Sequence, residues 1–332
     1  MKQLLKILTE TFGPSGYEDA IRKIILKEVK PLADEVHVDA LGNLIVHKKP
    51  AKGAKDSKKI MIATHMDEIG VMVTHVDSNG FARFTGIGGV APRNLPGGHV
   101  RFANGVRGII GIEPAAPADI PPLNKMFIDV GATSKKDCPI KTGDVAGFER
   151  SFLDLGDRLV AKSMDDRIGC TVAIEVLRTL KSTPHDVYFV FTTQEEVGTR
   201  GAQTSAYGID PDLGFSIDIT AWGDTPGQKD LEVALGKGPA IKIRDGGMIS
   251  DPRIVEWMIR TAEKAKIPYQ REVLLSGTTD ARAMQLVRGG LPVGCISIPC
   301  RYVHTPAEMV DYNDVKNVVK LIVSMLSNSV SI

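Results

Sequence analysis

The run Phe189–Thr193 restricts the fold of this 332-residue chain more than any other stretch. Its consecutive aromatic and β-branched residues predict a buried strand. Two adjacent carboxylates, Glu195 and Glu196, follow the run and lead into glycines. Ligands bind at the carboxyl ends of strands in an α/β sheet, so one glutamate could hold a metal ion while the other carries a proton. A solvated pair of glutamates at a strand exit is the alternative that this motif alone leaves open.

Short apolar segments alternate with helical patterns over most of the chain. The spacing of apolar residues predicts helices near residues 4–12, 21–29, 168–180, 201–207, 250–265, 280–287 and 315–326. It predicts strands near residues 35–39, 44–47, 60–63, 187–193, 213–220, 231–234, 239–243, 269–274 and 293–298. A capping box at Ser15–Glu18 and a cap at Ser250 indicate two helix starts. Strands that alternate with helices favour the α/β class, with a three-layer αβα arrangement around a mostly parallel sheet.

Histidines and carboxylates lie at the ends of several other predicted elements. His65 follows an apolar run, Asp165 opens an apolar helix, and Asp218 and His304 follow two further strands. Together with Glu196 they form a set of nitrogen and oxygen donors that suits zinc, cobalt or manganese. Each residue alone could be a helix cap, a turn residue or an ordinary buried histidine. All five at matching element ends favour a metal centre on one rim of the sheet.

Five ligands can hold two metal ions only if one ligand is shared. A carboxylate can bridge two metals through its two oxygens, so Asp165, at the fixed start of a helix, is the predicted bridge. The metals of a dinuclear site polarise a substrate carbonyl and acidify a bridging water. A base must still pass a proton to the leaving amine, and Glu195, next in sequence to the ligand Glu196, is placed for that role. Asp67, two residues after His65, is placed to orient that histidine.

Residues 71–159 have a different composition. They hold 13 of the 33 glycines, and short apolar stretches alternate there with turn signals such as Asn79–Gly80. The absence of a helical stripe from this segment predicts a small all-β domain. Because His65 precedes the segment and Asp165 follows it, we expect an insertion into a discontinuous catalytic domain of residues 1–70 and 160–332.

Five motifs resemble those of the tetrahedral, or glutamyl, aminopeptidases, a family of dinuclear metallopeptidases in the zinc aminopeptidase and carboxypeptidase superfamily. The motifs are Thr64–Gly70, Met164–Arg167, Gln194–Gly198, Ser216–Asp218 and Cys300–Glu308, and they occur in order over nearly the whole chain. The resemblance implies a zinc-peptidase-like catalytic domain. It also implies a metalloaminopeptidase that removes single residues from the free N-terminus of short peptides.

The same resemblance implies how the ligands divide between two metal ions. One ion would be held by His65 and Asp218, the other by Glu196 and His304, and Asp165 would bridge them, with the preceding glutamate of the pair as base. The peptide bond that follows Asp165 would be cis. The inserted domain would mediate dimerisation, and the dimers would assemble into a tetrahedral dodecamer.

Two short segments depart from the family's pattern. Ser276–Asp280 stands where the family usually has Gly-Gly-Thr-Asp, and Thr305 stands where serine is common. Neither segment contains a proposed ligand. The first departure leaves the role of Asp280 open.

Three other functions are compatible with these residues. A carboxypeptidase, or an amidohydrolase acting on N-acyl amino acids, could use the same site. Paired carboxylates also cleave sugars, as in an endoglucanase, but such acids need neither two histidines nor a bridging aspartate. A non-catalytic scaffold could keep the fold and the metals, although the intact Glu195 argues against it.

The composition speaks against several partners. A net charge of +1 gives no reason to expect nucleic acid or an anionic membrane as a partner. The four cysteines show no CxxC spacing, so reduced thiols are expected. The chain shows no signal peptide and no run of about 18 apolar residues. We therefore expect a cytoplasmic protein.

Overall fold

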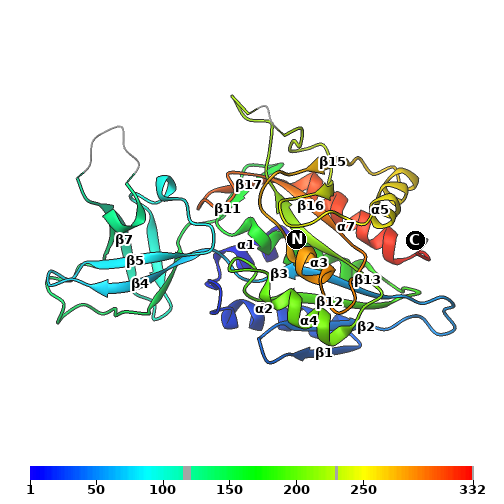
Figure 1. The fold of residues 1–332 in the computed structure, drawn as a ribbon, viewed down its shortest axis with the longest axis horizontal. Helices are drawn as coiled ribbons and strands as arrows, with labels where there is room; N and C mark the ends of the chain where they lie inside the picture. Colours follow the sequence, from blue (N-terminus) through cyan, green and yellow to red (C-terminus); the bar gives the residue numbers. More distant parts are fainter. Residues whose placement is uncertain (115–120, 229–230, 331–332) are drawn as a thin grey trace.

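The computed structural model describes residues 1–114, 121–228 and 231–330. Figure 1 shows a small group of strands, β4, β5 and β7 among them, to one side of a larger body of sheet and helices. The helices are α1 (Lys2–Glu10), α2 (Asp19–Val29), α3 (Met164–Thr179), α4 (Arg200–Ile209), α5 (Pro252–Lys264), α6 (Asp280–Gln285) and α7 (Tyr312–Leu326). Short 3-10 turns are η1 (Lys30–Leu32), η2 (Pro92–Asn94) and η3 (Leu123–Lys125). None of the helices in the described ranges is long and apolar enough to cross a membrane.

The strands belong to two separate sheets. The main sheet contains β1 (Glu35–Val38), β2 (Leu44–Lys48), β3 (Lys59–His65), β10 (Leu153–Asp154), β11 (Arg158–Ala161), β12 (Asp186–Thr192), β13 (Leu213–Thr220), β14 (Ala240–Arg244), β15 (Gln270–Val273), β16 (Val293–Arg301) and β17 (Glu308–Asp311). The smaller sheet contains β4 (Gly70–Val76), β5 (Ala82–Ile87), β6 (His99–Phe102), β7 (Arg107–Ile112), β8 (Met126–Asp129) and β9 (Val145–Phe148).

The main sheet has the order β1-β2-β12-β3-β13-β16-β17-β11-β10, with β14 and β15 attached beside β16. Its four central strands, β12-β3-β13-β16, are parallel. Apart from the parallel pair β14–β15, the strands around this centre pair antiparallel, so the sheet is mixed rather than mostly parallel. Only residues 39–43 join β1 to β2, and only residues 302–307 join β16 to β17. Such short connections lead to antiparallel neighbours, because a parallel crossover needs a dozen or more residues.

Successive residues of the central strands point to opposite faces, and each face has its own apolar cluster. In β3, Ile60 and Ile62 join a large cluster with α1, α2, α3, α5 and α7. Met61 and Ala63 join a second cluster with α4 and α6. Burial on both faces explains why the run Phe189–Thr193 lacks the polar alternation of a half-exposed strand.

The smaller sheet closes into a barrel with the order β4-β5-β8-β7-β6-β9. Buried apolar side chains such as Val71 and Phe102 form a separate core there. The barrel strands run from Gly70 to Phe148. In contrast, β10 and β11 pair with the main sheet through β17, although they precede or overlap the predicted boundary at residue 159.

Two strands differ from the sequence prediction. Residues 231–234 form no strand, because Ala234 pairs through its N–H and its carbonyl with the side chain of Gln270 instead of with a backbone ladder. Strand β17 has no counterpart in the prediction. Its four residues are too few for a visible alternation pattern, and its pairing with β11 and β16 stabilises it.

The two predicted helix caps also differ. The hydroxyl of Ser15 donates to the carboxylate of Asp67 at 2.6 Å, so Ser15 does not cap α2. Helix α5 is capped by Asp251 rather than by Ser250, whose hydroxyl donates to the carbonyl of Lys242. In both cases a tertiary contact takes the hydroxyl that the local pattern assigned to the helix.

Arg167 fastens the N-terminal segment to α3. Its fully buried guanidinium donates to the carbonyls of Leu8 at 2.7 Å, Thr11 at 3.1 Å and Gly13 at 3.3 Å. Its Nη2 also lies 3.8 Å from Oε1 of Glu68. One charged side chain therefore satisfies three backbone acceptors where the chain leaves α1.

Replacing Arg167 by methionine should lower the free energy of unfolding by about 3–5 kcal/mol, because three carbonyls and a buried carboxylate lose their charged donor. A matched control is Arg178→Met on the same helix, where the exposed ion pairs with Glu28 and Glu175 should contribute at most about 1 kcal/mol. Urea unfolding followed by tryptophan fluorescence measures both changes. Equal losses in the two variants would contradict the anchoring role.

Candidate metal centre

The parallel strands bring the five predicted ligands to one edge of the main sheet. Strand β3 ends at His65, β12 leads to Glu196, β13 carries Asp218, and His304 follows β16. These four strands are neighbours that run in the same direction, so their carboxyl ends meet. Asp165 lies in the first turn of α3 and faces the same edge.

The ligand atoms form two groups that share Asp165. One group is His65, Asp165 and Asp218, and the other is Asp165, Glu196 and His304. Within each group the ligand atoms all lie within 4.8 Å of one another. Oδ1 of Asp165 lies 2.9 Å from Nε2 of His65, and Oδ2 lies 3.2 Å from Nε2 of His304. The two oxygens of Asp165 therefore face different histidines, as a bridging carboxylate requires.

Asp67 contacts both His65 and the glutamate pair. Its buried Oδ1 lies 3.5 Å from Nδ1 of His65, and its backbone carbonyl lies 3.1 Å from the same nitrogen. The backbone N–H groups of Glu195 and Glu196 donate to its carboxylate at 3.0 and 3.1 Å. The hydroxyl of Ser15 donates to it as well. One carboxylate thus sets the orientation of His65 and the position of the glutamate pair.

Glu195 lies beside the ligands but belongs to neither group. Its side chain lines the same cavity as they do. Burial raises the pKa of Glu195 well above its ordinary value, and the carboxylates of Asp218 and Asp280 act in the same direction. A carboxylate with a raised pKa accepts a proton more readily near neutral pH, as a general base must.

The site favours positive charge. Burial opposes the charged imidazole of His304, yet Asp165 and Glu196 raise the pKa of His304 to about 12. Burial also opposes charge on His65, but Asp165 and Asp67 raise the pKa of His65 well above its ordinary value. The buried carboxylates therefore stabilise a cation at either histidine.

The donor set fits divalent metal ions. Oε1 of Glu196 is buried and receives no hydrogen bond from the described residues, although Nε2 of His304 lies 3.3 Å away. A buried carboxylate oxygen without a hydrogen-bond donor is stabilised by a nearby cation. Two imidazoles and three carboxylates are ligands that zinc, cobalt and manganese accept.

Two carboxylates that support the site were missing from the predicted set. Glu308 accepts the backbone N–H groups of Asp165 at 3.0 Å and His304 at 2.8 Å, so it holds two ligand segments together. Its position at the end of a motif, four residues after His304, was the only sequence signal. Glu18 accepts the N–H of Gln194 at 3.1 Å and supports the turn before the glutamate pair.

Two further aspartates lie near the ligands but outside both groups. The peptide bond between Asp165 and Asp166 is cis, as the family resemblance implies. Asp166 accepts the hydroxyl of Thr64. Asp280 accepts the hydroxyl of Thr192, and burial raises the pKa of Asp280 to about 6. Both side chains support strands β3 and β12 directly behind the site.

A cavity of about 490 Å³ opens in front of the ligands. Away from them it is lined by Thr220, Lys242, Leu274 and Thr278, among others. Lys242 is buried and pairs with Glu272 at 2.6 Å, so its charge is compensated. A cleft of this size can accommodate a small-molecule or short-peptide group next to the ligands.

Comparison with known proteins places these features in a family. Residues 42–321 match the family model of M42 glutamyl aminopeptidases. A protein from Acetivibrio thermocellus is 45% identical over 330 residues, which cover 98% of both chains. An aminopeptidase from the archaeon Desulfurococcus kamchatkensis has a TM-score of 0.94 and 42% identity, over 99% of this chain and 94% of that one.

The TET1 peptidase of Pyrococcus horikoshii, which can assemble into a tetrahedron or a large octahedral shell, has a TM-score of 0.87 and 33% identity over 99% of both chains. The similarity therefore extends over both the barrel and the main sheet. All five predicted ligands and the glutamate beside them lie within the matched range. These findings confirm the predicted family: the chain belongs to the M42 glutamyl aminopeptidases.

Proposed function

We propose that this chain is a metal-dependent aminopeptidase that hydrolyses the N-terminal peptide bond of short peptides. The observation that carries the proposal is the position of Asp165, whose two oxygens face two groups of ligands while Glu195 lies beside both. The aminopeptidase from Desulfurococcus kamchatkensis, with the same fold, supports the class of reaction.

In this proposal the site holds two divalent ions per chain. His65 and Asp218 would hold one ion, Glu196 and His304 would hold the other, and Asp165 would be shared by both. Zinc or cobalt suits this mixture of imidazole and carboxylate, and manganese is also accepted. When bound, the ions supply the Lewis acidity that polarises the scissile carbonyl and acidifies a water molecule.

Glu195 is the general base. Its carboxylate faces the cavity, where it can take a proton from the attacking water and deliver it to the leaving amine. Burial raises the pKa of Glu195, and with it the affinity of the ionised carboxylate for the proton that it takes from the water. Asp67 acts as a positioning residue, since it contacts His65 and the backbone of the glutamate pair rather than the cavity.

We also propose the domain roles predicted from the sequence. Residues 1–70 and 160–332 would form the catalytic domain, and the apolar clusters on both faces of its sheet support a three-layer αβα arrangement. The barrel would mediate assembly, because Ile109 and Ile112 of β7 are exposed on its surface. The TET1 relative can assemble into a tetrahedron, and a solved TET1 structure 34% identical to this chain is a dodecamer, which supports a dimer that builds a dodecamer. All four cysteines are free thiols, which supports a cytoplasmic location.

The substrate proposal predicts that a free amine is required. A short peptide should be cleaved from its N-terminus, whereas its N-acetylated form should not be cleaved measurably, because the exopeptidase must accommodate an unblocked amine beside the buried carboxylates. Mass spectrometry of the products measures both reactions. Cleavage of the acetylated form at an equal rate would instead indicate an amidohydrolase, and release of the C-terminal residue would indicate a carboxypeptidase.

The assembly proposal predicts that the intact chain is at least a dimer at micromolar concentration, with a dodecamer as the final form. Closed symmetric assemblies bury exposed apolar surface of this kind. Light scattering coupled to size-exclusion chromatography measures the mass. A fully active monomer would contradict a role for the barrel in assembly.

A further inference from the structure

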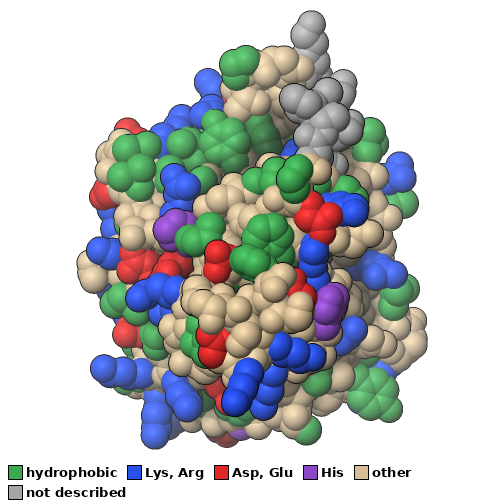
Figure 2. Space-filling view, turned by 90° about the vertical axis from the view of Figure 1, so that its left-hand side faces the viewer, with side chains coloured by type: hydrophobic (Ala, Val, Ile, Leu, Met, Phe, Trp, Pro, Cys, Tyr) green, Lys and Arg blue, Asp and Glu red, His purple; other side chains and the backbone are tan. Residues whose placement is uncertain are grey.

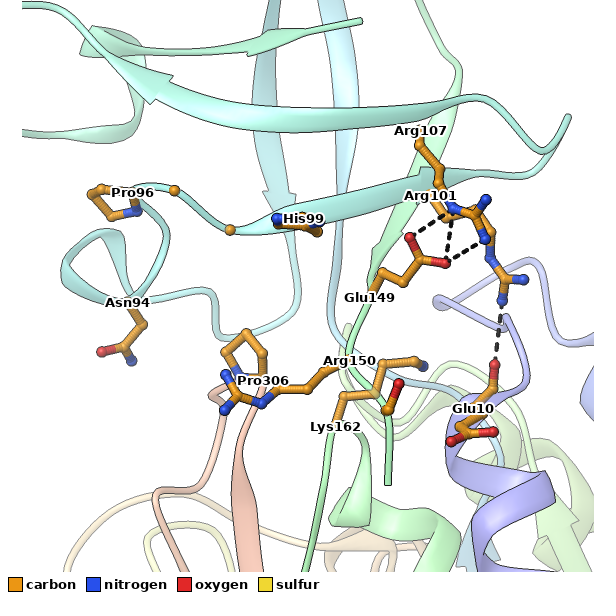
Figure 3. A pocket seen from close by; sticks show the side chains of 13 residues that line it. Glu10, Asn94, Pro96, His99, Arg101, Arg107, Glu149, Arg150, Lys162 and Pro306 are labelled. Atoms are coloured by element: carbon orange, nitrogen blue, oxygen red, sulfur yellow. Dashed lines mark hydrogen bonds and ion pairs between the residues drawn. The ribbon is translucent and has the colours of Figure 1, made fainter. Parts of the chain in front are cut away.

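A second cavity, of about 880 Å³, lies between the barrel and the main body, and the proposed reaction does not use it. Figure 3 shows its lining, with Arg101 and Arg107 on the barrel side and Glu10 and Lys162 on the side of the main body. Arg150 extends between the two walls. The cavity is larger than the one in front of the metal ligands, and cations outnumber carboxylates in its lining, whereas carboxylates predominate around the other.

Part of the positive charge in this cavity is compensated. The guanidinium of Arg107 forms a forked pair with Glu149, with N–O distances of 2.9–3.1 Å. The ammonium group of Lys162 is buried and pairs with Glu68 behind the wall. Neither cation needs a further partner to offset its charge.

Two arginines of the lining form no ion pair with a carboxylate among the residues that the structure describes. Arg101 donates to the backbone carbonyl of Glu10 at 3.2 Å, and the carboxylate of Glu10 accepts the N–H of Phe152 instead. Within the described ranges, Arg101 makes no ion pair, and Arg150 makes neither an ion pair nor a hydrogen bond. Two guanidinium groups thus border one cavity with most of their donors unused.

The cavity lies close to the metal ligands. Pro306 in its wall follows His304 by two residues, so their Cα atoms are at most about 7 Å apart. Lys162 precedes Asp165 by three residues, which limits that separation to about 11 Å. An extended tetrapeptide spans roughly 13–14 Å. A peptide of about this length is therefore long enough to bring one end to the ligands and the other to the cavity.

We propose that this cationic cavity binds the C-terminal carboxylate of a short peptide whose N-terminus lies at the metal centre. A guanidinium group offers a planar fork that matches a carboxylate. Arg101 and Arg150 each supply one such fork, and Figure 3 shows these forks on different sides of the cavity, with Arg150 beside Pro306 and Arg101 beside Glu10. The identity of the ligand as a substrate rests on the proposed aminopeptidase function, whereas the affinity of the cavity for a carboxylate does not.

The first experiment compares tetra-alanine with its C-terminal amide as substrates of the intact enzyme. Arg150→Gln should raise KM for the free acid by roughly tenfold, the cost of losing one charge-assisted contact, and leave kcat unchanged. KM for the amide should not change, because the amide carries no charge there. The control Arg271→Gln, an exposed arginine on β15, should change neither value. An equal KM for acid and amide in the unaltered enzyme would overturn the proposal.

The second experiment separates the cavity from catalysis. Isothermal titration calorimetry uses three ligands: N-acetyl-tetra-alanine as the free acid, its C-terminal amide, and inorganic phosphate. None of these ligands has a free N-terminal amine, so binding is measured without turnover. Only the free acid should bind, and Arg150→Gln should weaken its binding roughly tenfold. Binding of phosphate alone would overturn the assignment of a peptide ligand in favour of an inorganic anion. If the acid binds in an Arg150-dependent manner while no peptide is hydrolysed, the proposed function fails and the carboxylate site stands.

The exposed charges on the surface around the barrel can be compared with the arginines of the cavity. In the space-filling view of Figure 2, apolar side chains gather in the upper half of that face and Lys and Arg side chains along its lower edge. Exposed lysines and arginines bind anions weakly, because water screens them. Arg101 is partly buried, so its attraction for a carboxylate is less screened, whereas Arg150 is exposed and differs from a surface arginine in lining the cavity. At constant ionic strength, the Arg271→Gln control measures the contribution of ordinary surface charge.

Discussion

The whole arrangement depends on burying several like-charged carboxylates at the carboxyl ends of the parallel central strands of the main sheet. Lost hydration and mutual repulsion disfavour ionisation there, and they raise the pKa values of Asp218 and Glu195. Such a cluster needs cations nearby. Within the chain, His65 and His304 meet part of that need. Divalent metal ions meet it more fully, and for this reason we assign the ligand groups around Asp165 to metals rather than to a structural ion-pair network.

The fold meets a second requirement, which is to hold this cluster in place. The parallel centre of the sheet delivers the ligands from neighbouring strand ends, and cores on both faces fix those strands. The N-terminal segment then supports the site, since Ser15 bonds to Asp67 and Glu18 bonds to the N–H of Gln194. Arg167 ties the same segment to α3, the helix that carries Asp165. The packing of the N-terminal segment against α3 therefore helps to fix the positions of the proposed ligands.

The residues of the proposed metal centre could be located from the sequence because each stands at the end of a strongly patterned element. A strand such as Phe189–Thr193 is recognisable from its composition, and its position fixes where Glu195 and Glu196 must lie. Glu308 was harder to recognise, because its role depends on two backbone N–H groups that approach it only in the folded chain. The capping box at Ser15 failed for the same reason: a long-range acceptor, Asp67, competes with the local one.

Contacts between segments that are far apart in the sequence also explain the other differences between the predicted and the observed fold. The antiparallel edges of the main sheet follow from short connections, whereas the alternation of strands and helices reports only on its centre. The cationic cavity is built from segments that are far apart in sequence, and no local motif joins Arg101 to Lys162. The periodicity of the sequence reveals helices, strands and their ends. A cluster of side chains from both the barrel and the main sheet is visible only in the folded structure.

The central claim is that two glutamates adjacent in sequence have different tasks. The most direct test is the metal content of purified Glu195→Gln and Glu196→Gln, measured by elemental analysis together with kcat. Glu195→Gln should retain both ions and lose roughly 10²–10⁴-fold in kcat, the usual contribution of a general base. Glu196→Gln should lose occupancy at one of the two metal positions. Loss of metal from Glu195→Gln, with Glu196→Gln fully loaded, would contradict the account.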